Sequence, residues 1–312
     1  MAIDGGLISN SHYGPGLLLL LVWALVPDPS TVQASPALSE PRRGICVEDG
    51  LSQRICLSAS PTRIVSLAPS LTEMVFELGA GNLLVGRTAR CNEPAEVIRV
   101  PEIGAYLNPD LERIISLRPD LVLCPYVGMR PEVMTRLTEL GIPVFVDYCK
   151  NLDEIASLTR NLGSMLGKKE HAETLLRIFQ QRRSAVAARV EHLQKPVILF
   201  VVGIRPLVTA GGKSFVGSLI REAGGVNVAE SAFIPYPRYS MEEVTRHDPD
   251  VIVVVNKECR GSDCFDRWKG NETLTAIKTN RTYQMEANLI TRPTLKIIEA
   301  LERLAAILHP EM

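Results

Sequence analysis

The chain has 312 residues and a formal net charge of −1, with 22% charged and 46% apolar residues. This balance is typical of a folded soluble protein and excludes both a disordered chain and a protein with many membrane spans. Because there is no basic surplus to neutralise phosphates, nucleic-acid binding has no electrostatic support. A single core rarely grows beyond about 250–300 residues, so we expect two lobes.

The first predicted element is an apolar segment at residues 17–26, which ends at Pro27-Asp28-Pro29. As a helix it spans about 15 Å, half of a bilayer core, so it is too short to cross a membrane. Its length and the small residues of Val32-Gln33-Ala34 are typical of a secretory signal peptide at residues 1–34, although residues 1–16 lack Lys and Arg. The alternative is a buried core helix. No cysteine follows directly, so we expect an exported soluble protein without a lipid anchor.

Seven cysteines fit an oxidising compartment. After a leader at residues 35–43, Cys46 and Cys56 flank a predicted hairpin with Asp49-Gly50 at its turn, and we expect a disulfide between them. A second disulfide is predicted between Cys259 and Cys264, which close a short loop. No CxxC or Cys/His cluster exists, so a zinc site has little support. Three further cysteines follow or end predicted strands, and their pairing stays open: Cys91, Cys124 and Cys149.

The first α/β lobe is predicted at residues 63–165, after a hairpin segment that ends at residue 62. Ser70 is expected to cap its first helix, with Glu73 completing a capping box. Alternating strands and helices at this spacing indicate a parallel sheet with crossover helices. The expected order is strand 63–67, helix 70–78, strand 83–86, helix 111–117, strand 120–124, helix 131–140 and strand 143–147.

Helix-forming sequence then extends over residues 152–193, divided by Gly163 and Gly167. Its second part, residues 168–193, reaches about 39 Å if unbroken. We interpret residues 166–194 as a connecting helix between two lobes; the alternative is an ordinary surface helix. The second α/β lobe is predicted at residues 195–312, with strand 196–202, helix 218–223, helix 241–247, strand 251–255, helix 273–278, a strand near Tyr283 and helix 295–308.

The two predicted lobes share an internal repeat. Residues 111–123 resemble residues 241–254, with the same spacing from Glu to Pro-Asp, and an upstream match relates residues 77–82 to 222–227. Two similar lobes predict a ligand cleft at the carboxyl ends of their strands. The repeat also makes Glu112 and Glu242 equivalent. An acid in a first helical turn contributes about 0.3–1 kcal/mol through the helix dipole, whereas a matched pair favours contact with a two-fold basic partner.

Several motifs together resemble class III periplasmic substrate-binding proteins, which deliver vitamin B12, haem or ferric siderophores to ABC importers. The opening motif is Arg63-Ile-Val-Ser-Leu-Ala-Pro-Ser-Leu-Thr-Glu73, and Ile234-Pro-Tyr-Pro-Arg-Tyr-Ser-Met-Glu242 occurs later. The resemblance extends over about residues 45–312. Matching segments between and within these bounds are residues 104–114, 118–122, 140–144 and 223–227.

The resemblance implies an α/β fold in which two parallel-sheet lobes are joined by a single long helix, with the ligand cleft between the lobes. It implies a monomeric periplasmic carrier, not an enzyme, without a cofactor or metal of its own. The expected ligand is a corrinoid, with haem or a ferric siderophore as the alternative. The expected partner is a two-fold ABC importer permease with its ATPase subunits. An exported metal-cofactor enzyme and a ligand-free interaction module are further alternatives.

The resemblance also implies roles for individual residues. Glu112 and Glu242 match the acids that dock onto the permease, and Tyr106 and Tyr236 fall where vitamin B12 binders have tryptophans, with Tyr126 as a third cleft aromatic. Residues 90–94 and 288–292 depart from the family pattern, which leaves the identity of the chelate open. Two ligand contacts are predicted there. Arg292 is expected to pair with a carboxylate or phosphate of the ligand; the alternative is a surface charge. Cys91 is expected to be a soft metal ligand; the alternative is a packed or disulfide-linked thiol.

Overall fold

The computed structural model describes residues 44–256, 268 and 270–311. The predicted signal peptide and leader lie outside the described residues, as do Cys259 and Cys264 with their predicted disulfide. Residues 42–312 form one compact unit, and the description that follows is of the described residues of this unit alone. None of the helices in the described part of the chain is long and apolar enough to cross a membrane.

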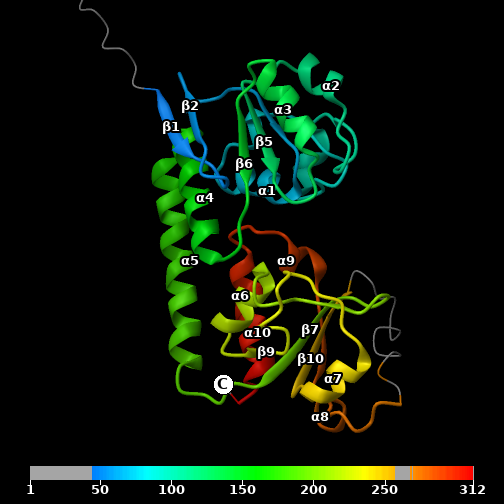
Figure 1. Cartoon of the computed structure of the whole chain (residues 1–312). Helices are drawn as coiled ribbons and strands as arrows, with labels where there is room; N and C mark the ends of the chain where they lie inside the picture. Colours follow the sequence, from blue (N-terminus) through cyan, green and yellow to red (C-terminus); the bar gives the residue numbers. More distant parts are fainter. Residues whose placement is uncertain (1–43, 257–267, 269, 312) are drawn as a thin grey trace, which may run out of the picture. The chain divides into compact units, whose positions relative to one another are not determined.

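The first lobe of this unit is built on a four-stranded parallel sheet with the order β4-β3-β5-β6. Two of these strands, β5 and β6, are labelled in Figure 1. Alternate strand residues enter two different cores: Leu121 and Leu123 pack with α1 and α4, whereas Val122 packs with α2 and α3. The elements are β3 (Ile64–Ser66), α1 (Pro69–Glu77), η2 (Gly81–Leu83), β4 (Leu84–Arg87), η3 (Ala95–Arg99), α2 (Leu111–Ser116), β5 (Leu121–Pro125), α3 (Pro131–Glu139) and β6 (Val144–Asp147).

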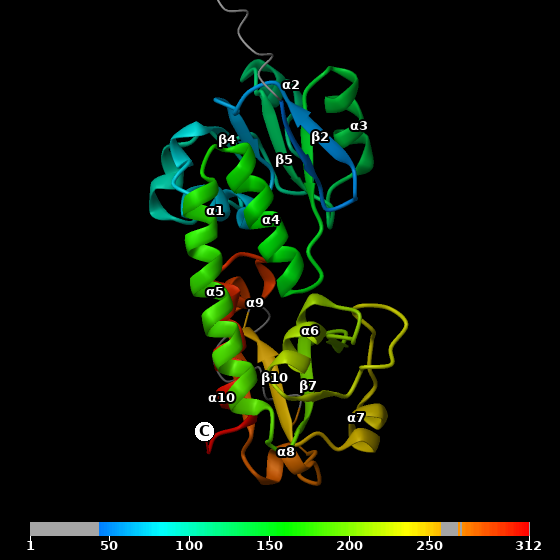
Figure 2. The ribbon, with the colours of Figure 1, turned by 90° about the vertical axis from the view of Figure 1, so that its left-hand side faces the viewer.

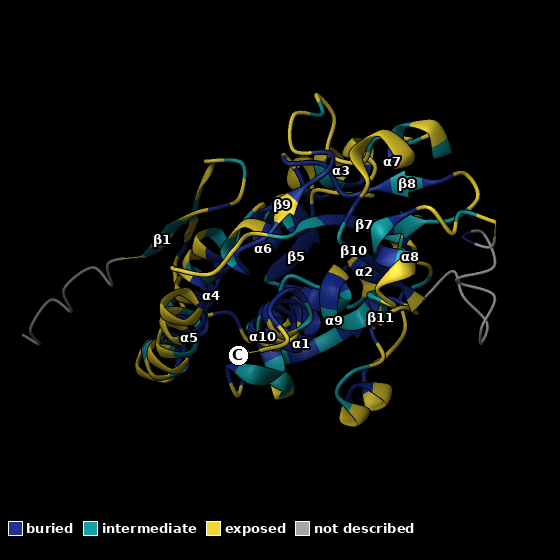
Figure 3. Cartoon of the chain, turned by 90° about the horizontal axis from the view of Figure 1, so that it is seen from below, coloured by how far each residue is buried: buried dark blue, intermediate teal, exposed yellow. Residues whose placement is uncertain are grey.

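The second lobe has a sheet with the order β11-β10-β7-β8, and β9 also pairs with β7. All of its pairings are parallel except that of β7 with β8. Figure 3 shows β5 as buried and most of α7 as exposed. The elements are β7 (Val197–Gly203), β8 (Val208–Thr209), α6 (Phe215–Glu222), β9 (Val226–Asn227), α7 (Met241–His247), β10 (Val251–Val255), α8 (Thr275–Lys278), β11 (Thr282–Met285), α9 (Ala287–Thr291) and α10 (Ile297–Leu308).

Two helices, α4 (Leu152–Met165) and α5 (Lys169–Val190), contribute to the cores of both lobes. In α5, Ala172 is buried in the core of the first lobe, whereas Phe179 and Val186 are buried in that of the second. In α4, Ile155 packs in the second core and Leu162 in the first. Figure 2 shows α5 extending alongside both lobes. The connection is therefore anchored by apolar side chains at both ends.

A disulfide-bonded hairpin is attached to the end of β6. Its strands β1 (Ile45–Glu48) and β2 (Arg54–Leu57) pair so that Cys46 lies opposite Cys56, and these two cysteines form the predicted disulfide. At the turn, the backbone N–H of Gly50 donates to the Val146 carbonyl at 2.7 Å. A Cβ on Gly50 would lie 2.4 Å from the backbone nitrogen of Tyr148, so this close approach requires glycine.

The repeat in the sequence corresponds to a repeat in the structure. Asp120, before β5, accepts a hydrogen bond at 2.7 Å from the backbone N–H of Thr62, just before β3. Asp250, before β10, accepts one at the same distance from Val197 at the start of β7. The Pro-Asp dipeptide therefore joins the beginnings of two neighbouring parallel strands in each lobe, as well as ending the preceding helix.

Three predicted helix starts are wrong, two of them by two or three residues and one by the identity of the cap. α1 begins at Pro69 with Ala68 as its cap, because proline is favoured at the first helical position; Ser70 and Glu73 therefore form no capping box. α6 begins at Phe215, where the Ser214 side chain accepts from Gly217 N, rather than at residue 218. α10 begins at residue 297 rather than 295, and the short α9 was not predicted.

Candidate functional site

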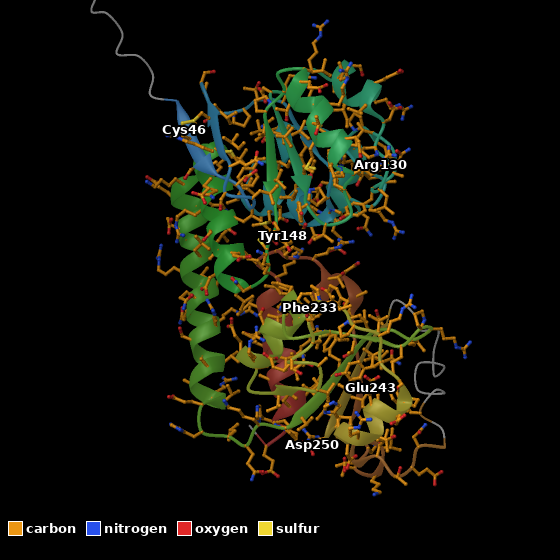
Figure 4. The ribbon with its side chains drawn as sticks, in the orientation of Figure 1. Cys46, Arg130, Tyr148, Phe233, Glu243 and Asp250 are labelled. Carbon is orange, nitrogen blue, oxygen red and sulfur yellow. A yellow bond between two sulfur atoms is a disulfide. The ribbon has the colours of Figure 1, made fainter. Side chains whose placement is uncertain are left out.

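A cavity of about 1140 Å³ lies between the two lobes. Both sheets contribute the carboxyl ends of their strands to it: Pro125 and Asp147 end β5 and β6, while Asn256 and Glu286 follow β10 and β11. This is the usual position of ligands in open α/β sheets, and it agrees with the predicted cleft. Figure 4 shows Tyr148, the residue after β6, at the junction of the lobes.

Aromatic side chains line the cavity from both lobes. Tyr106 comes from the first lobe and its hydroxyl donates to the Val127 carbonyl at 2.9 Å; Tyr236 comes from the second lobe and is 47% exposed. Burial raises the pKa of both phenols, so both are neutral at pH 7. Neutral rings on two facing walls suit an apolar planar ligand.

The third predicted tyrosine contacts a neighbouring tyrosine that lines the cavity and that was not predicted from the sequence. Tyr126 is not among the lining residues; its ring centre lies 4.6 Å from that of Tyr148, which does line the cavity. The Lys150 ammonium lies 4.4 Å from the centre of the Tyr148 ring. Tyr126 and Tyr148 each directly follow a strand. This equivalent position was the only feature of the sequence that could have identified Tyr148 as a cavity residue.

Cys91 does not line the cavity, and its position agrees with the alternative of a packed thiol rather than with a ligand contact. It is 1% exposed within the first core. Its sulfur accepts a hydrogen bond from the Thr72 hydroxyl at 3.1 Å and lies 3.3 Å from that of Thr88. Cys91, Cys124 and Cys149 are all free thiols. Of these Cys149 lines the cavity, and burial raises its pKa, as it raises that of Cys124 to about 12.

Arg292 lines the cavity, and its charge is already paired with residues of the first lobe. The alternative of a surface charge is therefore wrong, whereas its contact with a ligand stays a prediction. Its side chain is 13% exposed and forms an ion pair with Glu73 of α1. Arg292 also donates to the Asn92 amide oxygen at 2.8 Å and lies 3.7 Å from Glu93. Lys296 adds a second cation, 3.9 Å from the carboxylates of both Glu73 and Glu93.

Residues 90–94 and residues 288–292 are thus in contact with each other. Asn92 and Glu93 belong to residues 90–94, and Asn288 and Arg292 belong to residues 288–292. Besides the Arg292 contacts, the Asn288 amide donates to Glu93 at 3.3 Å. Side chains of both segments therefore form one polar bridge between the lobes at the wall of the cavity.

A buried carboxyl group forms another part of the wall. Asp147 is 6% exposed, and its Oδ1 has no hydrogen-bond partner among the described residues. Burial raises the pKa of this carboxyl group to about 6, against a smaller opposing effect of hydrogen bonds from Cys149. Asp147 is therefore mostly charged at pH 7 and becomes neutral in mildly acidic solution.

The two equivalent acids lie away from the cavity, each exposed in the first turn of its helix. Glu112 lies in α2, where Asp110 is the cap and accepts from the Arg113 N–H. Glu242 lies in α7, which Ser240 caps, and it pairs with Arg246 at 3.0 Å. Since other side chains cap both helices, capping does not account for either acid. Within the described residues, there is no group of three or more His, Cys, Asp or Glu side chains that could hold a metal ion.

Comparisons with known proteins agree with this geometry. The sequence profile of a family described as periplasmic binding protein matches residues 64–289. The vitamin B12-binding protein of Vibrio parahaemolyticus is 27% identical over 239 residues, which cover 77% of this chain and 86% of that protein. The protein of the same name from Pectobacterium atrosepticum is 27% identical over 246 residues, covering 77% and 88%.

Solved structures show the same two-lobed fold. The periplasmic vitamin B12 binding protein BtuF of Vibrio cholerae has a TM-score of 0.73 and 24% identity, and the match covers 80% of this chain and 98% of that one. The periplasmic haem-binding protein RhuT of Roseiflexus sp. RS-1 has a TM-score of 0.71 and 25% identity, with coverage of 80% and 98%. A periplasmic haem-binding protein of Pseudomonas aeruginosa has a TM-score of 0.70 and 25% identity, covering 80% and 93%.

Proposed function

The chain belongs to the periplasmic binding protein family, and on this premise we propose that it is the substrate-binding protein of an ABC importer for a corrinoid. It captures the corrinoid between its lobes and delivers it to the permease. It works as a monomer in the periplasm after removal of a signal peptide at residues 1–34. Its role is binding and delivery without chemical conversion.

The cavity is the observation that carries this proposal. At about 1140 Å³, it exceeds the about 300–1000 Å³ typical of pockets for drug-sized ligands. Tyr106 and Tyr236 face it from opposite lobes, and rigid aromatic rings bury a large ligand surface with few rotors to freeze. A large, flat and partly apolar chelate fits these features, and the vitamin B12-binding relatives favour a corrinoid.

Haem is the second candidate, because haem-binding proteins are among the similar structures and tyrosine is a known ligand of ferric iron. A tyrosine that binds Fe(III) does so as a phenolate. Burial raises the pKa of Tyr106 and of Tyr236, and the Tyr106 hydroxyl already donates to Val127. Both observations oppose phenolate formation and favour a corrinoid held by stacking.

Glu112 and Glu242 are proposed as the contacts with the permease, which works together with its ATPase subunits. They occupy equivalent positions in the two lobes, both are exposed, and neither lines the cavity. Two acids related by the repeat suit two equivalent basic sites on a two-fold partner.

A ligand screen on the chain from residue 35 onward tests the function. Thermal unfolding is measured with cobalamin, haem and a ferric siderophore, and absorption spectra are recorded after gel filtration. We expect cobalamin to raise the Tm and to elute with the protein, since a ligand at 100 times its Kd stabilises by about 2.7 kcal/mol. A Soret band with haem and no cobalamin shift would assign haem instead. Stabilisation by none of the chelates would overturn the carrier function.

A further inference from the structure

We propose that Arg90 recognises an anionic group, a phosphate ester or a carboxylate, on the chelate that the cavity takes. This inference rests on the proposed carrier function and adds the chemistry that selects among chelates. Arg90 lines the cavity, its side chain is exposed, and it forms no ion pair with any residue that the structure describes.

The neighbouring cations differ from Arg90 because their charges are already paired. Arg292 is held by Glu73 and lies near Glu93. Arg87, three residues before Arg90, is 5% exposed, lies 3.5 Å from Glu102 and donates to two backbone carbonyls. Residues 90–94 therefore place one cation on the cavity wall with which none of the described residues forms an ion pair.

The backbone on both sides of Arg90 is fixed. The Ala89 N–H donates to the Gly104 carbonyl at 2.9 Å, and the Cys91 N–H donates to the Thr88 carbonyl at 3.0 Å. Cys91 is also buried beside the Thr72 and Thr88 hydroxyls. Because these contacts hold the main chain, Arg90 need only order its side chain when it meets a ligand, which lowers the entropic cost of binding.

The remaining charges on the cavity wall do not cancel Arg90. Glu286 follows β11 on the opposite lobe and Asp147 is buried at the end of β6; neither is ion-paired with Arg90 within the described residues. A guanidinium presents a planar fork that matches carboxylate and phosphate oxygens in a bidentate arrangement. Partial exclusion of water from the cavity would strengthen that attraction.

Matched pairs of chelates test the inference. Cobalamin carries a phosphodiester in its nucleotide loop, whereas cobinamide lacks it; haem carries two carboxylates, whereas its dimethyl ester carries none. In each pair, we expect Arg90→Gln to lower the binding affinity for the chelate that bears the anion by about ten- to hundredfold. The affinity for its neutral counterpart should fall by less than about threefold. A loss confined to the cobalamin pair identifies a phosphate, and one confined to the haem pair identifies a carboxylate.

Two further variants keep the result interpretable. Arg99→Gln removes an exposed arginine from η3 that does not line the cavity and should change neither affinity. Arg90→Lys keeps the positive charge without the planar guanidinium and should retain part of the preference for the anionic chelate of each pair. An equal loss for both members of each pair would overturn the role of Arg90 while leaving the carrier function intact. Failure of the wild-type chain to bind any of the four chelates would overturn both.

Discussion

Arg292, at the end of α9 in the second lobe, is ion-paired with Glu73 of α1 in the first lobe, 219 residues earlier in the chain. The pair is largely shielded from solvent, since the two side chains are 13% and 3% exposed. Asn92 and Glu93 on one lobe and Asn288 and Lys296 on the other extend it. This bridge joins the lobes at the cavity wall, apart from the connection through α4 and α5.

Removal of Arg292 should therefore destabilise the chain strongly. Arg292→Met leaves the Glu73 carboxylate buried with only Lys296 nearby, and we expect a loss of about 3 kcal/mol in the free energy of unfolding. Urea denaturation at pH 7 measures it. Arg182→Met is the matched control, because Arg182 pairs with Glu302 at a more exposed site where both side chains are 38% exposed; it should cost at most about 1 kcal/mol. Equal losses would contradict the importance of the bridge.

Asp147 should make the stability of the fold depend on pH. Its pKa is raised by burial to about 6, so between about pH 4 and pH 6 the folded chain holds a proton that the unfolded chain has released. Stability therefore falls as the pH rises through this window, by about 3 kcal/mol in total. Asp147→Asn should remove this contribution from the pH dependence, which urea titrations between pH 4 and pH 7 measure.

Two other acids, Glu77 and Asp153, help to interpret the pH experiment. Glu77, whose pKa burial raises to about 7, contributes a slope of the same sign, so part of the dependence should persist in the Asp147 variant. Asp153→Asn is the control. The hydrogen bond from Arg183 lowers the Asp153 pKa, so Asp153 changes the stability only at pH values below this window. A variant of Asp147 with an unchanged slope would show that its carboxyl group titrates normally.

The two cavity tyrosines should differ from Tyr126 in their effect on ligand affinity. Tyr236→Ala removes an aromatic wall, and we expect about a tenfold loss of affinity by fluorescence or calorimetry. Tyr126→Ala changes a ring of similar exposure that does not line the cavity and should lose less than about threefold. Both substitutions are at partly exposed sites, so thermal unfolding should verify that each variant folds. A larger effect from Tyr126 would restore the original prediction from the sequence.

Reversal of the two equivalent acids should separate transport from binding. In cells, Glu112→Arg combined with Glu242→Arg should abolish uptake of the chelate, and each single change should reduce it in part. Ligand affinity of the purified double variant should stay within about twofold, because neither acid lines the cavity. Glu132→Arg reverses an exposed acid in the first turn of α3 and should leave uptake unchanged. Weakened ligand affinity in the double variant would refute the docking role.

Gly50 should couple the hairpin to the cavity. In Gly50→Ala the new Cβ would lie 2.4 Å from Tyr148 N and 2.9 Å from the Val146 carbonyl oxygen, so either the turn or the end of β6 must move. We expect a loss of about 2 kcal/mol in stability together with weaker ligand binding, since Tyr148 lines the cavity. Gly203→Ala, whose nearest contact would be 3.4 Å, should be tolerated. Unchanged binding by a destabilised Gly50 variant would confine the effect to the hairpin.

The sequence by itself determined the α/β class, the two lobes and the internal repeat, because these features depend on local signals. Each of these signals acts over a few residues. They are the apolar strand segments, the Pro-Asp dipeptides that contain Asp120 and Asp250, and the Asp49-Gly50 turn. The same signals determined the Cys46–Cys56 disulfide, which spans a short hairpin. The positions of Glu112 and Glu242 in first helical turns followed from the repeat.

Only the tertiary structure decided which of the predicted side chains reach the cavity. From the sequence, Glu73 was predicted to cap its own helix. In the structure Pro69 begins that helix, and the Glu73 carboxylate forms an ion pair with Arg292 of the other lobe. Cys91 and Arg90 are neighbours in sequence, but one is buried beside Thr72 and the other lines the cavity. Such choices depend on the packing of segments up to 219 residues apart, and no periodicity within either segment contains that information.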